Sequence, residues 1–480
     1  MTGARFVAVV KRDCPTCALI EPALAELSLV ADLTVYSQDD PDFPAGVTRI
    51  VDDRDLVFSW HHDIETVPTL LRLDGDAGDD WSAAARIVGW LRDEWRTFTG
   101  IADLGGQLPE YRPGCGSLSV DPNLVDELRV RHGGSVLRAR HVELASAEDE
   151  FEAMYDRGWS DGLPLVPPTP ERVMAMLAGT DCPPDQIVAT IPPDLVECTV
   201  EKVAINAVMA GCRPEYLPVV LAAVEAACTD EFNMHGLLAT TWFSGPMVVA
   251  SGPMAHRIGM NSGLNALGQG NRANATIGRA LQLVVRNVGG GKPGGVDRAT
   301  LGNPGKYTFC FAEAELDPAL GWPTQAIEHG IDADDSAVTL FAAEGVRGVV
   351  DQISRTPESL TRHFALVLRT VASPKLAIAF DAAMVISPEH LRVYTDAGWT
   401  KARLRSELDE LLTIDGAEFA RGYGGIDEGM PAGFEAMPLP KFRSGGLLIF
   451  HAGGGAGMFS AVIGGWASGA MGSEPISRAI

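Results

Sequence analysis

The segment that most constrains the fold is a cysteine pair set between a strand pattern and a helix pattern. Residues 5–10 run apolar like a buried strand, and residues 18–29 carry apolar side chains at helical spacing. Between them stands Cys14-Pro-Thr-Cys17. This order places Cys14 at a helix N-terminus, where free amides and the helix dipole favour a thiolate, with Cys17 one turn deeper. The pattern suits a nucleophilic cysteine and a resolving partner.

Half of a zinc site is the alternative interpretation of this spacing. Such a site needs four ligands, and no second CxxC or CxxH pattern lies near Cys14 and Cys17 to complete them. We therefore expect no bound metal and no cofactor.

Further strand patterns cover residues 33–36, 66–71 and 85–90, and a helix pattern covers 92–98. The second of these strands opens with Thr-Val-Pro68. A Cys-Pro-x-Cys motif ahead of a Thr-Val-Pro resembles the thioredoxin/glutaredoxin superfamily, over about residues 1 to 100. The resemblance implies a thioredoxin-like fold in which a cis Pro68 faces the cysteines and contacts substrate. It also implies that Cys14 is the nucleophile and Cys17 the resolver.

Charged neighbours bear on the reactivity of two thiols. Asp13 is expected to raise the pKa of Cys14, because a carboxylate disfavours an adjacent thiolate. Cys115 lies among proline and glycine, which predicts an exposed turn, and nearby Arg112 favours its thiolate. Cys115 is thus a candidate for passing electrons between the first domain and the rest. The alternative is a linker cysteine without a role.

Residues 259–306 combine glycine, asparagine and arginine at unusual density. Glycine lets backbone amides approach a ligand closely, and Asn and Arg side chains add directed donors. Asn271 and Arg272 precede a helix pattern, and Lys306 stands where a glycine loop ends. These residues predict a pocket for an anion or a carbonyl compound. The alternative is a glycine-rich turn in a packed core.

Two histidines are candidates for the same pocket. His235 lies among small polar residues in an expected loop, which suits a neutral-pH proton carrier, although a structural histidine is equally compatible. His451 follows a strand pattern and precedes the glycine loop 453–457, after which a helix is expected. The glycine spacing fits neither a Walker loop nor the dinucleotide fingerprint, so no nucleotide is expected.

The predicted fold class is α/β, with an N-terminal thioredoxin-like domain and a large multi-layer α/β region. The expected parts are a thioredoxin-like domain (1–104), a connector with Cys115 (105–154), a glycine- and asparagine-rich catalytic domain (155–345) and an α/β C-terminal domain with a glycine-rich loop (346–480). In the last part a strand is expected at 376–380, and the Gly/Pro-rich residues 416–440 are a candidate lid. The run from Trp159 to Tyr307 is similar to an uncharacterised bacterial domain family that follows a thioredoxin-like domain, taken here to cover about 155–480. That resemblance implies no activity.

Charge and cysteine usage narrow the possible partners. A net charge of -25 opposes binding to nucleic acid or to anionic membranes. Eight cysteines spread over 480 residues, without an N-terminal signal peptide pattern, indicate a reducing cytoplasm. The uncharged stretch near His451 is interrupted by recurring glycine, so we expect no membrane span there.

These observations predict a thiol-dependent oxidoreductase in which Cys14 and Cys17 supply reducing equivalents, through Cys115, to a small-molecule site. The residues expected at that site are His235, Asn271, Arg272, Lys306 and His451. Covalent tethering would raise the effective concentration of the reductant. Expected partners are a small-molecule substrate and an electron donor of the thioredoxin reductase type, and a homo-oligomer is left open. The alternatives are a lyase or hydrolase for a small carboxylate or amide, with the first domain as a docking or regulatory module, and a redox chaperone.

Overall fold

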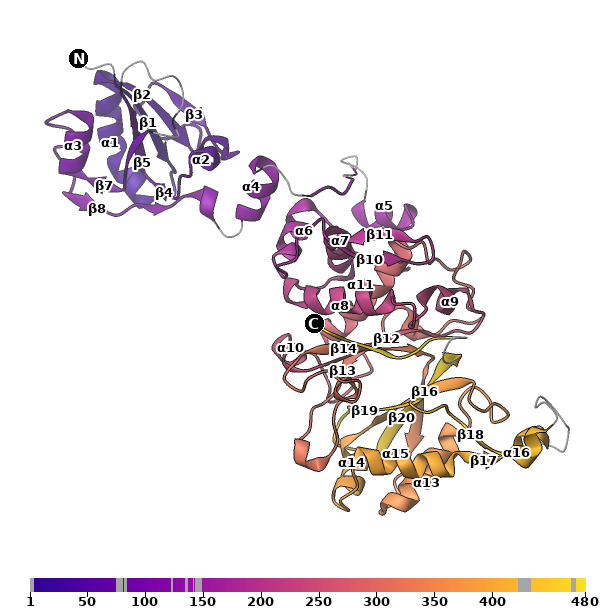
Figure 1. Cartoon of the computed structure of the whole chain (residues 1–480). Coiled ribbons are helices and arrows are strands. Elements are labelled where there is room, and N and C mark those ends of the chain that lie inside the picture. The colour runs from indigo at the N-terminus through magenta and orange to yellow at the C-terminus, as the bar shows by residue number, and fades with distance from the viewer. Residues whose placement is uncertain are drawn as a thin grey trace. The chain divides into compact units, whose positions relative to one another are not determined.

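The computed structural model is an α/β protein that divides into two compact units, Met1–Leu137 and Arg138–Ile480 (Figure 1). It describes residues 4–74, 81, 84–121, 124–133, 137–140, 142, 149–421, 433–467 and 472–480. The expected connector, residues 105–154, is therefore divided between the two units. Much of the candidate lid lies outside the described residues. Among the described residues, none of the helices has the length and apolarity needed to cross a membrane.

The first unit is built on a five-stranded mixed sheet with the order β3-β2-β1-β5-β6. β1 runs parallel to β2 and antiparallel to β5. The strands are β1 (Arg5–Val10), β2 (Asp32–Ser37), β3 (Ile50–Asp52), β5 (Thr69–Leu73) and β6 (Ala85–Val88). The other elements are α1 (Pro15–Val30), α2 (Val57–His61), β4 (Thr66–Val67), β7 (Trp90–Leu91), α3 (Arg92–Thr99), β8 (Tyr111–Arg112), β9 (Cys115–Gly116), η1 (Leu118–Val120) and α4 (Val125–His132).

Helix α1 starts where its sequence provides a cap. Cys14 occupies the N-cap position, and Pro15 follows at the first helical position, where its missing N–H is not needed. Ile20, Leu24 and Leu27 recur at helical spacing and are fully buried in one cluster with β1. This packing fixes the cysteine pair at the end of the sheet.

The second unit begins with a helical layer on a four-stranded sheet of order β13-β12-β14-β21. Helices α7, α8 and α11 pack together, and α8 also packs on β14. The sheet comprises β12 (Gly245–Ser251), β13 (Cys310–Ala312), β14 (Ala337–Ala343) and β21 (Ile476–Ala479). The other elements of this part of the unit are α5 (Glu150–Asp156), α6 (Pro170–Leu177), β10 (Ile187–Ile191), β11 (Val196–Thr199), α7 (Val200–Ala210), η2 (Pro214–Tyr216), α8 (Leu217–Ala227), α9 (Met234–Ala239), α10 (Pro253–Arg257), α11 (Arg272–Asn287), η3 (Pro304–Lys306), η4 (Pro318–Leu320) and α12 (Gln325–Glu328).

A second four-stranded sheet, of order β15-β20-β16-β19, packs face to face on the first, and its other face is covered by helices (Figure 1). Phe311 of the first sheet meets Phe450 of the second edge to face in the shared core. The elements are β15 (Val346–Val350), α13 (Pro357–Leu368), β16 (Phe380–Ile386), α14 (Pro388–Thr395), α15 (Lys401–Leu411), β17 (Thr413–Asp415), α16 (Gly416–Arg421), η5 (Phe434–Ala436), β18 (Pro438–Pro440), β19 (Leu447–His451) and β20 (Phe459–Ala467). This unit therefore has four layers: helices, sheet, sheet and helices.

Two local predictions in this unit are wrong. The segment after the glycine loop 453–457 is strand β20 rather than a helix, because it pairs with both β15 and β16. Its Gly464 and Gly465 allow the close approach of Glu344 and of the Asp381 backbone. The strand expected at 376–380 is not formed: residues 376–379 are irregular, and β16 begins only at Phe380.

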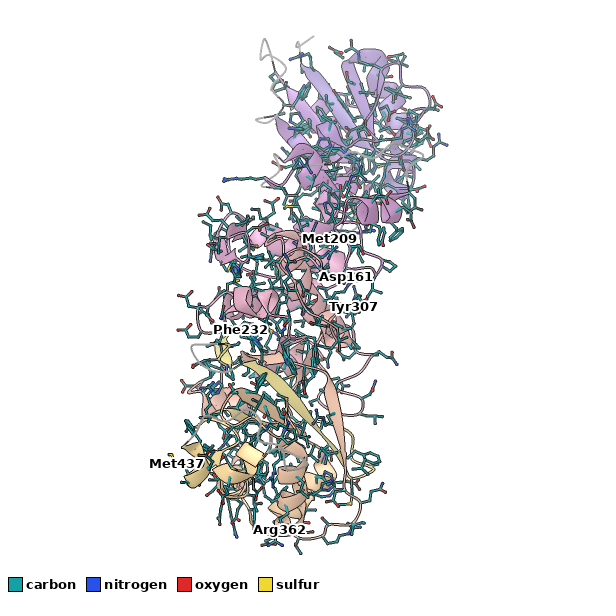
Figure 2. The ribbon with its side chains drawn as sticks, turned by 90° about the vertical axis from the view of Figure 1, so that its right-hand side faces the viewer. Asp161, Met209, Phe232, Tyr307, Arg362 and Met437 are labelled. Atoms are coloured by element: carbon teal, nitrogen blue, oxygen red, sulfur yellow. The ribbon has the colours of Figure 1, made fainter. Side chains whose placement is uncertain are left out.

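An extended arm ahead of α6 is fastened to α11 by a buried ion pair. Arg279 and Asp161 form two hydrogen bonds of 2.8 Å, with side chains only 13% and 12% exposed. Val166 on the same arm donates its N–H to the Met209 carbonyl at 3.1 Å. Asp161 and Met209 are both labelled in Figure 2. Asp161 thus has a structural partner in the helical layer.

Candidate functional site

The candidate site is the cysteine pair at the N-terminus of α1 in the first unit. Cys14 and Cys17 are free thiols, and both are fully buried. The Cys17 backbone N–H donates to Cys14 Sγ at 3.4 Å, as an N-cap bond does. On the other side, Cys14 Sγ lies 3.6 Å from the Val67 carbonyl oxygen. The nucleophile predicted from the sequence is thus held between a helix end and strand β4.

Cys14 is electrostatically prepared to be a thiolate. A hydrogen bond from the Cys17 thiol, the largest influence, lowers the pKa of Cys14 from 9.0 to about 5, against the opposing effect of burial. A further hydrogen bond comes from the Cys115 thiol. The net shift is therefore downward, and Asp13, which was expected to raise this pKa, is not among its largest influences. Burial, followed by the neighbouring Cys14 sulfur, raises the pKa of Cys17.

Pro68 and Cys115 are both found beside the pair. The Val67–Pro68 peptide bond is cis, and Pro68 is buried directly after β4. Cys115 belongs to β9, which pairs antiparallel with β4 so that Cys115 stands opposite Val67. The residue is half-buried, and burial raises the pKa of its thiol. The predicted exposed turn, with a thiolate favoured by Arg112, is therefore wrong: tertiary pairing makes this segment a strand.

Residues 113–119, here called the cover segment, are fixed on both sides of Cys115. Thr16 Oγ1 donates to the Pro113 carbonyl at 2.6 Å, and the Ser117 N–H donates to the Glu65 carbonyl at 3.0 Å. The first bond joins the segment to α1 and the second extends its pairing with the residues before β4. The cover segment is thereby held across the end of the dithiol.

A buried polar network completes this attachment. Gln38 Nε2 donates to Ser117 Oγ at 2.6 Å, and Gln38 Oε1 accepts the Leu118 N–H at 3.1 Å. Ser119 Oγ donates to the Ile64 carbonyl at 2.5 Å. Gln38, Ser117 and Ser119 are each 3% exposed or less. Buried polar groups that are all satisfied rigidify the structure around them.

These positioning residues give little signal in the sequence. The alternation of Ser117 and Ser119 with apolar neighbours is a weak strand-like signal. Gln38 gives no local signal, because its role depends on residues about 80 positions away.

The residues predicted for the second site all lie in the second unit, and the contacts found there do not join them into one cluster. His235 is exposed on α9, not in a loop. Asn271 is the N-cap of α11, accepting the Asn274 N–H at 3.0 Å and donating to the Gly259 carbonyl at 2.8 Å. Arg272 Nε donates to the Gly211 carbonyl at 2.9 Å. These bonds give Asn271 and Arg272 structural roles.

Lys306 and His451 also have partners within the second unit. Lys306 Nζ pairs with Asp297 at 2.7 Å. His451 is buried at the end of β19 with its Nδ1 2.9 Å from the Ile386 carbonyl oxygen, and burial lowers the pKa of its imidazole. The two glycine-rich stretches do meet, since the Gly453 N–H donates to the Ser262 carbonyl at 2.8 Å. They form a packed backbone contact within the second unit.

Four thiols of the second unit are poor nucleophiles. Burial raises the pKa of Cys198, Cys212 and Cys228 to about 12, and raises that of Cys310 further. In the part of the chain that the structure describes, no three His, Cys, Asp or Glu side chains gather as metal ligands.

Comparison with known proteins adds no family. No protein-family model matches the chain, and no curated protein matches it either. The function is therefore inferred from the geometry of the site.

Proposed function

We propose that the protein is a thiol-disulfide oxidoreductase whose nucleophile is Cys14. The observation that carries the proposal is the state of this one sulfur. It caps the N-terminus of α1 by accepting the Cys17 N–H, and hydrogen bonds from two further thiols help to lower its pKa to about 5. At neutral pH such a thiol is a thiolate, the form that attacks disulfides.

In this role Cys14 attacks a partner disulfide and is itself joined to the partner. A second thiol of the chain then attacks Cys14 and releases the partner as a dithiol. Cys17 lies one helical turn away, with its N–H on Cys14 Sγ. An electron donor of the thioredoxin reductase type would restore the thiols.

That these electrons serve a small-molecule site formed by His235, Asn271, Arg272, Lys306 and His451 stays a prediction. So does the alternative of a lyase or hydrolase. An assay on the full chain separates them: the Cys14→Ser variant loses any activity that the relay sustains, whereas a lyase or hydrolase activity of the second unit persists in it.

The oxidoreductase proposal is tested by reduction of insulin disulfides with dithiothreitol as the electron source. We expect Cys14→Ser to remove catalysis and Cys17→Ser to accumulate disulfide-linked forms of Cys14. Cys182→Ser is the control, because that cysteine belongs to the second unit and not to the CxxC pair. Equal rates for wild type and Cys14→Ser would rule the proposal out.

A further inference from the structure

The cover segment lies on the dithiol in the manner of an added strand. Its β9 residues pair with β4, which places Cys115 opposite Val67, and Val67 O is the atom that contacts Cys14 Sγ. The Cys115 thiol also contributes, as a hydrogen-bond donor, to the lowered pKa of Cys14. Cys115 on β9 and Cys14 at the start of α1 both adjoin Val67 of β4, which positions the two thiols for exchange.

The same pairing closes the site. Cys14 has no exposed surface while β9 lies on β4, although its pKa is lowered to about 5. A partner disulfide must reach Cys14 Sγ to be attacked. The cover segment therefore has to leave β4 before a partner enters.

Gly114 makes the close approach possible. A Cβ atom at this position would lie 2.4 Å from Thr66 Cγ2 and 2.9 Å from the Val67 carbonyl oxygen, which is too close for any side chain. At Gly116, two residues further on, a Cβ would have nothing within 4 Å. Glycine is thus required at the first position and not at the second.

We propose that Cys14 and Cys115 form an intramolecular disulfide during turnover, and that this bond locks the cover segment over the site. The inference rests on the proposed function, because it requires Cys14 to exchange disulfides. It adds a third redox cysteine, and it names Thr16, Gln38, Ser117 and Ser119 as its positioning residues.

The proposed disulfide exchange takes place in successive steps. Cys14 thiolate attacks a partner disulfide, forms a mixed disulfide and expels one partner thiolate. The cover segment returns, and Cys115 attacks Cys14 Sγ, releasing the second partner thiolate, which takes the Cys115 proton. Two electrons have passed from Cys14 and Cys115 to the partner. Attack by Cys17 then transfers the bond to Cys14–Cys17 and frees Cys115, and a donor dithiol reduces that pair.

Accessibility favours Cys115 over Cys17 for the second step. Burial raises the pKa of both thiols, so the difference between them lies in exposure: Cys17 is fully buried. Cys115 is half-buried on a segment that has to move in any case.

The bond is tested by treating the full-length Cys17→Ser variant with glutathione disulfide and mapping its disulfides by mass spectrometry. We expect a Cys14–Cys115 bond within one chain. In Cys17→Ser/Cys115→Ser, glutathione should remain on Cys14. A Cys17→Ser protein that keeps glutathione on Cys14 beside a free Cys115 overturns the inference and leaves the proposed function standing. Failure of Cys14 to take up glutathione in the double variant overturns both.

The cover is tested without changing a sulfur. In Gly114→Val the segment cannot dock, so alkylation of Cys14 by iodoacetamide should be at least about tenfold faster than in wild type, since a protected thiol reacts only when its cover opens. Gly116→Ala is the matched control and should react like wild type. Unchanged circular dichroism shows that the variants are folded. Equal alkylation rates in Gly114→Val and wild type would show that the segment does not cover Cys14.

Discussion

At the scale of single residues, the state of Cys14 depends on donors that surround it. The largest influence on its pKa is the hydrogen bond from the Cys17 thiol. Replacing Cys17 by Ala removes this donor, so the pKa of Cys14 should rise from about 5 by roughly one to two pH units, as expected for one charge-assisted hydrogen bond.

The measurement is the ultraviolet absorbance of the thiolate as a function of pH. Because the thiolate exists above the pKa, the absorbance midpoint of Cys17→Ala should move upward, while Cys182→Ala should leave it in place. A midpoint that stays near pH 5 in Cys17→Ala would show that the helix N-terminus alone sets this pKa.

Glu313 is a second residue whose ionisation matters. It is 4% exposed, and burial raises the pKa of its carboxyl from 4.5 to about 7, against the attraction of Lys401. The folded state therefore holds a proton that the unfolded state releases between these values, and stability falls as pH rises through them. Above about pH 7 the loss amounts to about 3 kcal/mol.

Glu313→Gln mimics the protonated carboxyl and removes this loss. Thermal unfolding of the second unit should occur at a higher temperature in the variant than in wild type at about pH 8, and at nearly the same temperature at about pH 5. A stabilisation of equal size at both pH values would contradict the assignment.

At the scale of elements, substitutions of Asn271 at the start of α11 distinguish a structural role of this residue from a role in ligand binding. Its side chain caps the helix through the Asn274 N–H and also donates to the Gly259 carbonyl. Asn271→Ala should destabilise the second unit by about 1 kcal/mol, as loss of an N-cap does. Asn271→Asp keeps the cap acceptor and should lose less. Chemical denaturation of the two variants measures the difference.

Elements with strong local patterns were predictable, and those made by distant pairing were not. The strand pattern at 5–10 coincides with β1, and the cysteine pair does open a helix. β9 spans only two residues, Cys115 and Gly116, and it exists because it pairs with β4 almost fifty residues earlier. Likewise, β20 is a strand because two neighbours pair with it.

In the candidate site, too, residues with a local pattern were predictable and those placed by distant pairing were not. Cys14 and Cys17 are recognisable in the sequence, because two reactive thiols and the start of a helix pattern fall within the same four residues. The position of Cys115 against them required the tertiary pairing. For Asn271, Arg272 and Lys306, polarity in a glycine-rich stretch indicated a pocket, whereas the structure shows caps and an ion pair. Composition does not distinguish donors that serve the backbone from donors that serve a ligand.

At the scale of the whole molecule, two units with separate cores should unfold separately. Among the described residues, one hydrophobic cluster lies wholly in the first unit, and the others lie in the second. Differential scanning calorimetry should therefore resolve two transitions. Oxidised Cys17→Ser should shift only the one that belongs to the first unit, because a Cys14–Cys115 bond closes a loop of about 100 residues and should add about 3–5 kcal/mol.

Cys17→Ser/Cys115→Ser is the control, since it cannot close the loop and should show no shift on oxidation. A shift in both transitions would mean that the two cores unfold together. The absence of any shift in Cys17→Ser would agree with a failure of the Cys14–Cys115 bond in the mapping experiment.

The packing at Gly114 has a consequence for sequence variation. With hydrogen as its side chain, this residue allows the cover segment to pack against β4, and a single methyl group would prevent that packing. A library of all amino acids at residue 114 should thus divide sharply into one closed protein and many permanently reactive ones, whereas the same library at residue 116 should vary little. Only glycine at position 114 therefore allows the cover segment to close over Cys14.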